Sequence, residues 1–110
     1  PGDGPAARHQ KAVAGIDVPE DLRLPTQVVN TKDPQGYPIV GMTWLLVYQK
    51  QEVTAKSEAE AKALVNYLNW VLTEGQKLNE GASYVQLAPS VVKQAQALIA
   101  TMTYNGKPLK

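Results

Sequence analysis

The strongest pattern in the sequence is an apolar stretch over residues 37–48 that does not alternate with polar positions. It contains Ile39 and Val40 and the uninterrupted run 44–48, which are rich in β-branched and aromatic side chains. This composition favours a β-strand, and a strand that is apolar on both faces is usually central and covered by helices on both sides. We therefore expect one long, buried strand, with Gly41 allowing a bend or a bulge within it.

Shorter elements are expected before this strand. Residues 6–14 have a helical composition, with Pro5 suited to the first turn and Gly15 to the end of the helix. A loop or single turn is predicted over 20–24, and 27–29 has the composition of a short strand. Residues 33–36 predict a β-turn, because proline is favoured at its second position and glycine at its fourth.

Two amphipathic helices are predicted after the strand. Ser57 and Glu60 have the spacing of a capping box, in which the serine hydroxyl accepts from an N–H three residues later. The apolar stripe of the helix that follows consists of Ala61, Leu64, Val65, Leu68, Val71 and Leu72. Gly75 indicates a break, after which 76–80 can resume as a turn of helix.

The second helix is expected to begin at Pro89 after a short extended link over 84–87. Its apolar stripe consists of Val92, Ala95, Leu98, Ile99 and Met102. Residues 105–108 are expected to end it, followed by a polar tail.

The predicted order is a helix, a short strand, a long strand and two helices, which indicates an α/β architecture. One long strand and one short strand make a poor sheet by themselves, because a strand that is apolar on both faces needs neighbours and covering layers. The pattern therefore indicates an incomplete lobe whose missing strands come from a partner segment.

The composition and charge of the chain exclude several classes of function. The net charge is +1, from 11 basic and 10 acidic residues without a basic block, so we expect no nucleic-acid partner. The chain has no cysteine, which excludes disulfides and thiolate chemistry but leaves the compartment open. The apolar run 44–48 is far shorter than the roughly 20 residues of a membrane-spanning helix. The sequence starts at Pro1 without an initiator Met, so we expect a processed product, an engineered product or a fragment. Residues 1–5 do not have the pattern of a signal peptide.

Candidate catalytic and metal-binding residues form no recognisable set. His9 is the single histidine, and triad chemistry needs a paired nucleophile and an orienting group. The carboxylates show neither metal-ligand spacing nor a facing acid and base pair; they are Asp17, Glu20, Asp21, Glu52, Glu58 and Glu60. We therefore expect no catalytic residue, no metal site and no cofactor.

Anion binding and ring stacking are alternative roles for two further features of the sequence. The helix N-termini at Ser57 and at Pro89 offer free backbone N–H groups to an anion, but helix capping is the commoner use of such a serine. Trp44 and Trp70 can stack on a ligand, although their positions in a core strand and on an apolar helix favour burial.

Several segments together resemble the phosphate-binding proteins of bacterial phosphate ABC transporters. Residues 37–40 leading into 43–47 are similar to the family's aromatic-Pro-Ile and Thr-aromatic-hydrophobic strand, and 68–76 are similar to its helix ending in a Thr-Glu-Gly-Gln turn. Residues 84–92 resemble its Tyr-x-x-Leu-Pro entry to the last helix, and 106–109 resemble its C-terminal ending. The resemblance extends from about Asp17 to the end of the chain.

This resemblance implies a type II periplasmic-binding fold, in which two α/β lobes joined by crossing strands clamp the anion. Residues 1–36 would be the tail end of the second lobe, with a flexible N-terminus. Residues 37–110 would be the C-terminal segment of the first lobe, with 37–48 as the crossing strand. The family's hydroxyl, backbone N–H, Arg and Asp ligands lie in earlier motifs that are absent here, so no phosphate-binding residue is assigned to this chain.

The leading hypothesis is the C-terminal portion of an extracytoplasmic or periplasmic phosphate receptor for ABC-type import, without enzymatic activity. Its expected partners are the complementary N-terminal portion, in the same or a separate chain, an ABC permease, and phosphate bound through the whole receptor. The alternatives are a stand-alone interaction or scaffolding module that reuses the fold, and a small enzyme. The ligand stays open among phosphate, sulfate and other oxyanions.

Overall fold

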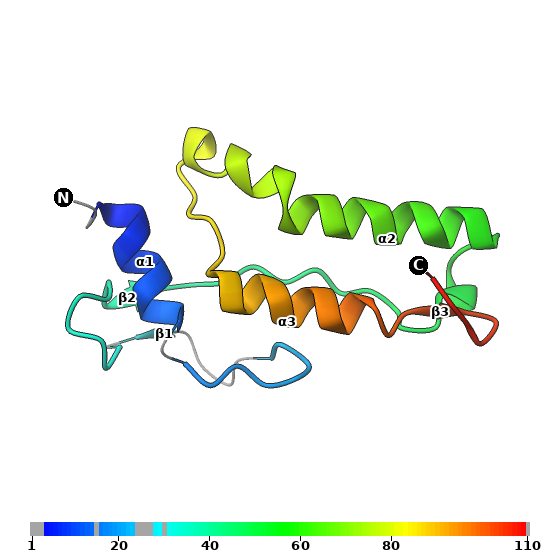
Figure 1. Ribbon diagram of the computed structural model, residues 1–110, viewed down its shortest axis with the longest axis horizontal. Coiled ribbons are helices and arrows are strands. Elements are labelled where there is room, and N and C mark those ends of the chain that lie inside the picture. Colours follow the sequence, from blue (N-terminus) through cyan, green and yellow to red (C-terminus); the bar gives the residue numbers. More distant parts are fainter. Residues whose placement is uncertain (1–3, 15, 24–27, 30, 110) are drawn as a thin grey trace.

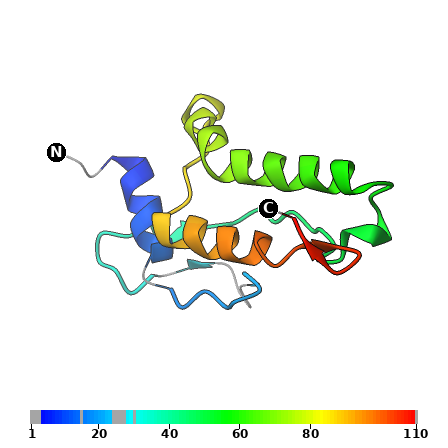
Figure 2. The ribbon, with the colours of Figure 1, turned by 45° about the vertical axis from the view of Figure 1, so that its right-hand side comes forward.

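The computed structural model describes residues 4–14, 16–23, 28–29 and 31–109. The molecule is elongated, measuring 47 × 28 × 17 Å along its principal axes. Helices α2 and α3 lie side by side and run in opposite directions, and the segment between β2 and α2 runs along the same long axis (Figures 1 and 2). The architecture is a mixture of helices and two small antiparallel sheets, which is compatible with the predicted α/β class.

The N-terminal elements agree with the sequence-based predictions where the structure describes them. Helix α1 spans Pro5–Ala14. Strand β1 (Val28–Val29) pairs antiparallel with β2 (Ile39–Val40). The predicted turn joins them: the Gly36 N–H donates to the Asp33 carbonyl at 2.9 Å, and Asp33 Oδ1 accepts from the Gln35 N–H at 2.8 Å. The predicted helix stop at Gly15, and residues 24 and 27 of the predicted loop and strand, lie outside the described residues.

The capping box at the start of α2 is confirmed. A short 3₁₀ helix, η1 (Gln51–Val53), precedes α2, which spans Glu58–Leu72. Ser57 Oγ accepts from the Glu60 N–H at 3.1 Å. The Glu60 carboxylate accepts in turn from the Lys56 N–H at 2.6 Å, one residue earlier than a standard box. Two further 3₁₀ helices, η2 (Glu74–Leu78) and η3 (Glu80–Ala82), follow the helix.

The C-terminal tail is a hairpin instead of the predicted polar tail. Helix α3 spans Pro89–Ile99, and β3 (Thr103–Tyr104) then pairs antiparallel with β4 (Lys107–Pro108). Asn105 and Gly106 connect them with φ angles of 49° and 80°, as a tight hairpin turn requires. The hairpin returns Leu109 to the core, where it is only 2% exposed.

The long strand predicted over 37–48 is wrong in its extent. Only Ile39–Val40 forms a strand, and 41–48, all of them described, lie outside any strand or helix. Leu46 in this stretch is 95% exposed. The physical reason is that a β-strand needs a partner for its backbone groups, and β1 reaches only the first residues of the stretch. Trp44 and Trp70, which we expected to be buried, are 39% and 46% exposed.

The buried residues of the described chain form two separate clusters, one at each end of α3. The first joins α1 and the loop after it to the start of α3 and contains Ala12, Val13, Val18, Ala88 and Val91. The second joins α2 and the hairpin to the end of α3 and contains Ala61, Val65, Leu68, Met102 and Leu109. In α3 the buried valine is Val91, whereas the predicted stripe began at Val92. A single domain usually has one contiguous core, and the described residues depart from that arrangement.

The overall dimensions also exceed those of a compact domain of this length. The radius of gyration is 15.7 Å, whereas a compact domain of this length has about 13 Å. The accessible surface is 7780 Å², which is roughly 1,800 Å² more than a compact monomer of this mass exposes. In the described residues, every helix falls short of the length and apolar content needed to cross a membrane.

Candidate functional site

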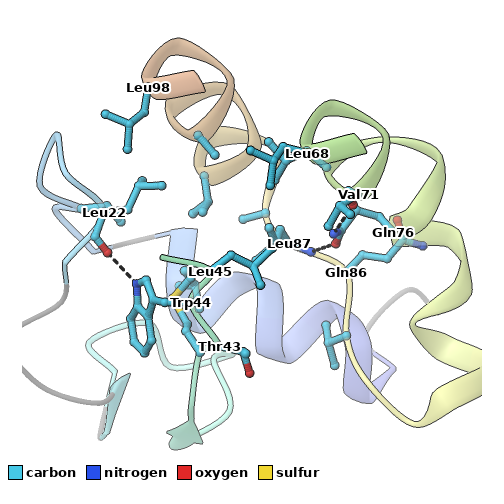
Figure 3. A pocket seen from close by; sticks show the side chains of 18 of the residues that line it. Leu22, Thr43, Trp44, Leu45, Leu68, Val71, Gln76, Gln86, Leu87 and Leu98 are labelled. Atoms are coloured by element: carbon cyan, nitrogen blue, oxygen red, sulfur yellow. Dashed lines mark hydrogen bonds between the residues drawn. The ribbon is translucent and has the colours of Figure 1, made fainter. Parts of the chain in front are cut away.

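A large apolar cavity lies between the two clusters. Its volume is about 1020 Å³. The walls come from α2, α3, the link before α3 and the stretch after β2, and Figure 3 shows Leu45, Leu68, Leu87 and Leu98 pointing into it. The cavity is partly open to solvent, and pockets of roughly 300–1,000 Å³ that are mainly apolar are the usual size and character of binding clefts.

One wall of the cavity is formed by residues 43–47, which we call the apolar segment. The lining residues of this segment are Thr43, Trp44, Leu45 and Val47, whereas Leu46 does not line the cavity and is 95% exposed. Leu45 and Val47 are themselves 63% and 44% exposed. The apolar segment therefore lies along the cavity and still leaves much apolar surface open to solvent.

The backbone of the apolar segment lacks hydrogen-bond partners in the part of the chain that the structure describes. Its ends, in contrast, are next to paired residues. Val40 pairs with Val28 before it, and the Gln49 carbonyl after it accepts from the Thr103 N–H at 2.9 Å. Lys50 then forms a parallel bridge with Thr103. Among the described residues, backbone pairing is thus seen at the two ends of the stretch.

Trp44 closes one side of the cavity. Its indole N–H donates to the Leu22 carbonyl at 2.9 Å, which ties the apolar segment to the loop after α1 (Figure 3). Beside it, Asp21 and Arg23 form an exposed ion pair at 3.6 Å. Most of the remaining lining is aliphatic, so the cavity suits apolar side chains better than an anion.

At the other end of the cavity, Gln76 is a buried polar residue that the sequence patterns did not identify. Its Oε1 accepts from the Leu87 N–H at 2.8 Å, and its Nε2 donates to the Val71 carbonyl at 2.8 Å. Oε1 also accepts from Asn79 Nδ2 at 3.1 Å. Its position directly after Gly75, where the helix breaks, was the one available signal, because orphan carbonyls at a helix end need donors.

Several residues that could in principle take part in catalysis or metal binding make structural contacts in this molecule. His9 stacks on Tyr37, with 4.4 Å between ring centroids. Glu52 accepts from the Asn105 N–H at 3.1 Å, and Glu58 pairs with Lys62 at 3.1 Å on the surface of α2. Within the described ranges, His, Asp and Glu form no group of three or more that could hold a metal ion. The expectation that the chain has no catalytic, phosphate-binding or metal-binding residue stays a prediction.

Sequence comparison relates the chain to a protein whose name states what it binds. The chain matches no protein-family model and no solved structure. Over 75 residues it is 41% identical to the phosphate-binding protein PstS of Methanocaldococcus jannaschii. The match covers 67% of this chain but 18% of the relative, so the chain spans less than a fifth of that protein. The chain is a partial homologue of a phosphate-binding protein.

Proposed function

We propose that this chain is the C-terminal portion of an extracytoplasmic phosphate-binding receptor for ABC-type phosphate import. The observation that carries the proposal is the 41% identity over 75 residues to a protein named as phosphate-binding. The motifs over 37–47, 68–76 and 84–92 resemble the same family. The relative is described as a binding protein, so the portion is proposed to be non-catalytic.

The proposed architecture is part of a type II periplasmic-binding fold. We assign 37–110 to the first lobe and 1–36 to the tail end of the second. Two features support an incomplete lobe: antiparallel helices α2 and α3 with a wide cavity beside them, and an apolar segment that pairs with no strand among the residues that the structure describes. A lobe of this class is a sheet covered by helices on both faces, and such a sheet is what the cavity lacks.

In this proposal the anion is bound by the rest of the receptor. The matched residues are a small share of the relative, and the cavity in this chain is lined mainly by aliphatic side chains. An anion needs donors such as arginine, hydroxyl or backbone N–H groups converging on one point. The chain therefore contributes structure, and its partners are the complementary portion of the receptor and, through the whole receptor, phosphate and an ABC permease.

The alternative of a stand-alone interaction module is less well supported. A self-sufficient domain of this length would bury its core in one cluster and expose about 5,900 Å². The divided core and the 7780 Å² of exposed surface favour a portion of a larger fold.

Isothermal titration with phosphate tests the proposal. The first sample is this chain alone. The second is a chimera, defined as the M. jannaschii relative with its matched residues replaced by this chain. We expect no heat of binding from the chain and micromolar or tighter binding from the chimera. A parallel titration with sulfate identifies the oxyanion. Phosphate binding by the chain alone, or a folded chimera that does not bind phosphate, would contradict the proposal.

A further inference from the structure

We infer that Asn105 is a site of spontaneous deamidation, and that the isoaspartate formed there opens the C-terminal hairpin. The reaction uses the side-chain amide of Asn105, the backbone nitrogen of Gly106 and water as the co-reactant. The inference goes beyond the proposed function, because it concerns a chemical change in the chain itself and does not depend on what the receptor binds.

The residue after Asn105 supplies the first argument. Asparagine is a thermolabile residue, and the backbone nitrogen that attacks its side chain belongs to the residue that follows it. Asn105 precedes Gly106, whereas the other asparagines of the chain precede larger residues; these are Asn30, Asn66, Asn69 and Asn79. Glycine has no Cβ to crowd its own nitrogen, and a Cβ built at Gly106 would meet nothing within 4 Å. The attacking nitrogen of Gly106 is therefore the least crowded of the set.

The position of the pair in the fold supplies the second argument. Asn105 and Gly106 are both exposed, so water reaches them, and they form the turn between β3 and β4 with φ angles of 49° and 80°. Cyclisation requires this backbone to rotate out of the turn. The two strands pair over two residues each, and short two-stranded hairpins are only marginally stable in water. Asn66 is also exposed, but it lies inside the 15-residue helix α2, which must unwind before the same rotation is possible.

The covalent step is an exchange of ammonia for water. Base from the solvent removes the proton of the Gly106 N–H, and that nitrogen forms a bond to Cγ of Asn105. The bond from Cγ to Nδ2 breaks, and the leaving nitrogen takes up a proton and departs as ammonia. Water then opens the cyclic imide. Addition at Cγ gives aspartate, whereas addition at the main-chain carbonyl of Asn105 gives isoaspartate, in which the chain continues through Cβ and Cγ.

Isoaspartate is incompatible with the hairpin as it is built. It adds one atom to the main chain inside a two-residue turn, and the length of the turn fixes the register of the strands that it joins. It also places a new carboxylate next to Glu52, whose side chain accepts from the Asn105 N–H at 3.1 Å, and like charges repel. The hairpin holds Leu109 in the core at 2% exposure, with its N–H donating to the Met102 carbonyl at 3.2 Å. Opening the hairpin therefore releases Leu109 from the cluster that joins α2, α3 and the hairpin.

Ageing of the chain at mildly alkaline pH tests the chemical part. Peptide mass spectrometry measures the conversion of amide to acid at each asparagine, and enzymatic methylation of isoaspartate identifies the isomer. The amide of Asn105 is expected to be lost at least about tenfold faster than that of Asn66, with isoaspartate among the products at 105. A smaller ratio, or aspartate at 105 without isoaspartate, overturns the inference.

Hydrogen exchange of the Leu109 amide tests the structural part. The isoaspartyl fraction of the aged chain is separated by chromatography, and its Leu109 amide is expected to exchange at least about tenfold faster than in the unmodified fraction. The control is Asn105→Gly, which has no side-chain amide and keeps a Gly-Gly pair that suits the same turn. After the same ageing, its Leu109 amide should be unchanged. Equal protection in the isoaspartyl and unmodified fractions, or an equal loss in the aged control, overturns the inference. Phosphate takes no part in either measurement, so its titration decides the proposed function separately.

Discussion

The side chain of Gln76 accepts a hydrogen bond from the backbone N–H of Leu87 at 2.8 Å and thereby joins the turn after α2 to the link that enters α3. The same side chain donates to the Val71 carbonyl near the end of α2. It is 9% exposed, so water does not readily replace these partners. One amide group thus sets the spacing of the two helices at one end of the cavity.

Replacing Gln76 with alanine is expected to loosen this end of the helix pair. The substitution leaves the Leu87 N–H and the Val71 carbonyl unsatisfied, and each such buried group costs about 1–3 kcal/mol. The Leu87 amide should therefore exchange roughly 5- to 150-fold faster than in the parent chain. The control is Gln96→Ala on the exposed side of α3, which should leave the Leu87 amide unchanged. Similar exchange in both variants would show that the Gln76 hydrogen bonds do not hold the link.

Two glycines offer a matched test of the C-terminal hairpin. A Cβ at either Gly106 or Gly81 would meet nothing within 4 Å, but Gly106 has a φ of +80°. Gly106→Ala is expected to destabilise the hairpin by about 1–2 kcal/mol, because L-residues are strained in the left-handed region. Gly81→Ala should be neutral or slightly stabilising. The measurement is exchange of the Leu109 N–H, which donates to the Met102 carbonyl at 3.2 Å. Equal effects of the two substitutions would contradict the assigned turn.

Elements with a local chemical signal were predictable from the sequence. Ser57 and Glu60 marked the start of α2, Pro89 marked the start of α3, and the residues around Pro34 marked the turn, because each signal acts on its own backbone neighbours. The hairpin at Asn105 and Gly106 has an equally local signal, the Asn-Gly pair. The sequence-based prediction of a polar tail did not use this signal.

Elements that depend on distant partners were not predictable in the same way. The composition of 37–48 predicts a two-sided apolar environment, but forming a strand also needs neighbours, and among the described residues these are found only at the ends of the stretch. The cavity and the role of Gln76 follow from how α2 and α3 pack, which periodicity alone does not specify.

The capping serine of α2 gives a further prediction. Ser57→Ala removes the acceptor of the Glu60 N–H and is expected to cost about 0.5–2 kcal/mol. Exchange of the Glu60 amide should rise roughly 2- to 30-fold, with smaller effects later in the helix. Ser57→Asp should retain protection, because aspartate caps well and favours the positive end of the helix dipole. If alanine and aspartate behave alike, the cap does not stabilise the helix.

The two tryptophans report separately on which side of the chain the rest of the receptor covers. Both are about equally exposed in the chain, but Trp44 lies within the apolar segment, whereas Trp70 stacks on Tyr67 with 6.2 Å between ring centroids. In fluorotryptophan-labelled protein, with signals assigned through Trp44→Phe and Trp70→Phe, the ¹⁹F shift difference between H₂O and D₂O measures the exposure of each ring. On going from chain to chimera, that difference should shrink for Trp44, because added strands cover it, and stay nearly constant for Trp70. Loss of solvent contact at Trp70 with Trp44 unchanged would place the covering surface on the exposed side of α2 instead of along residues 43–47.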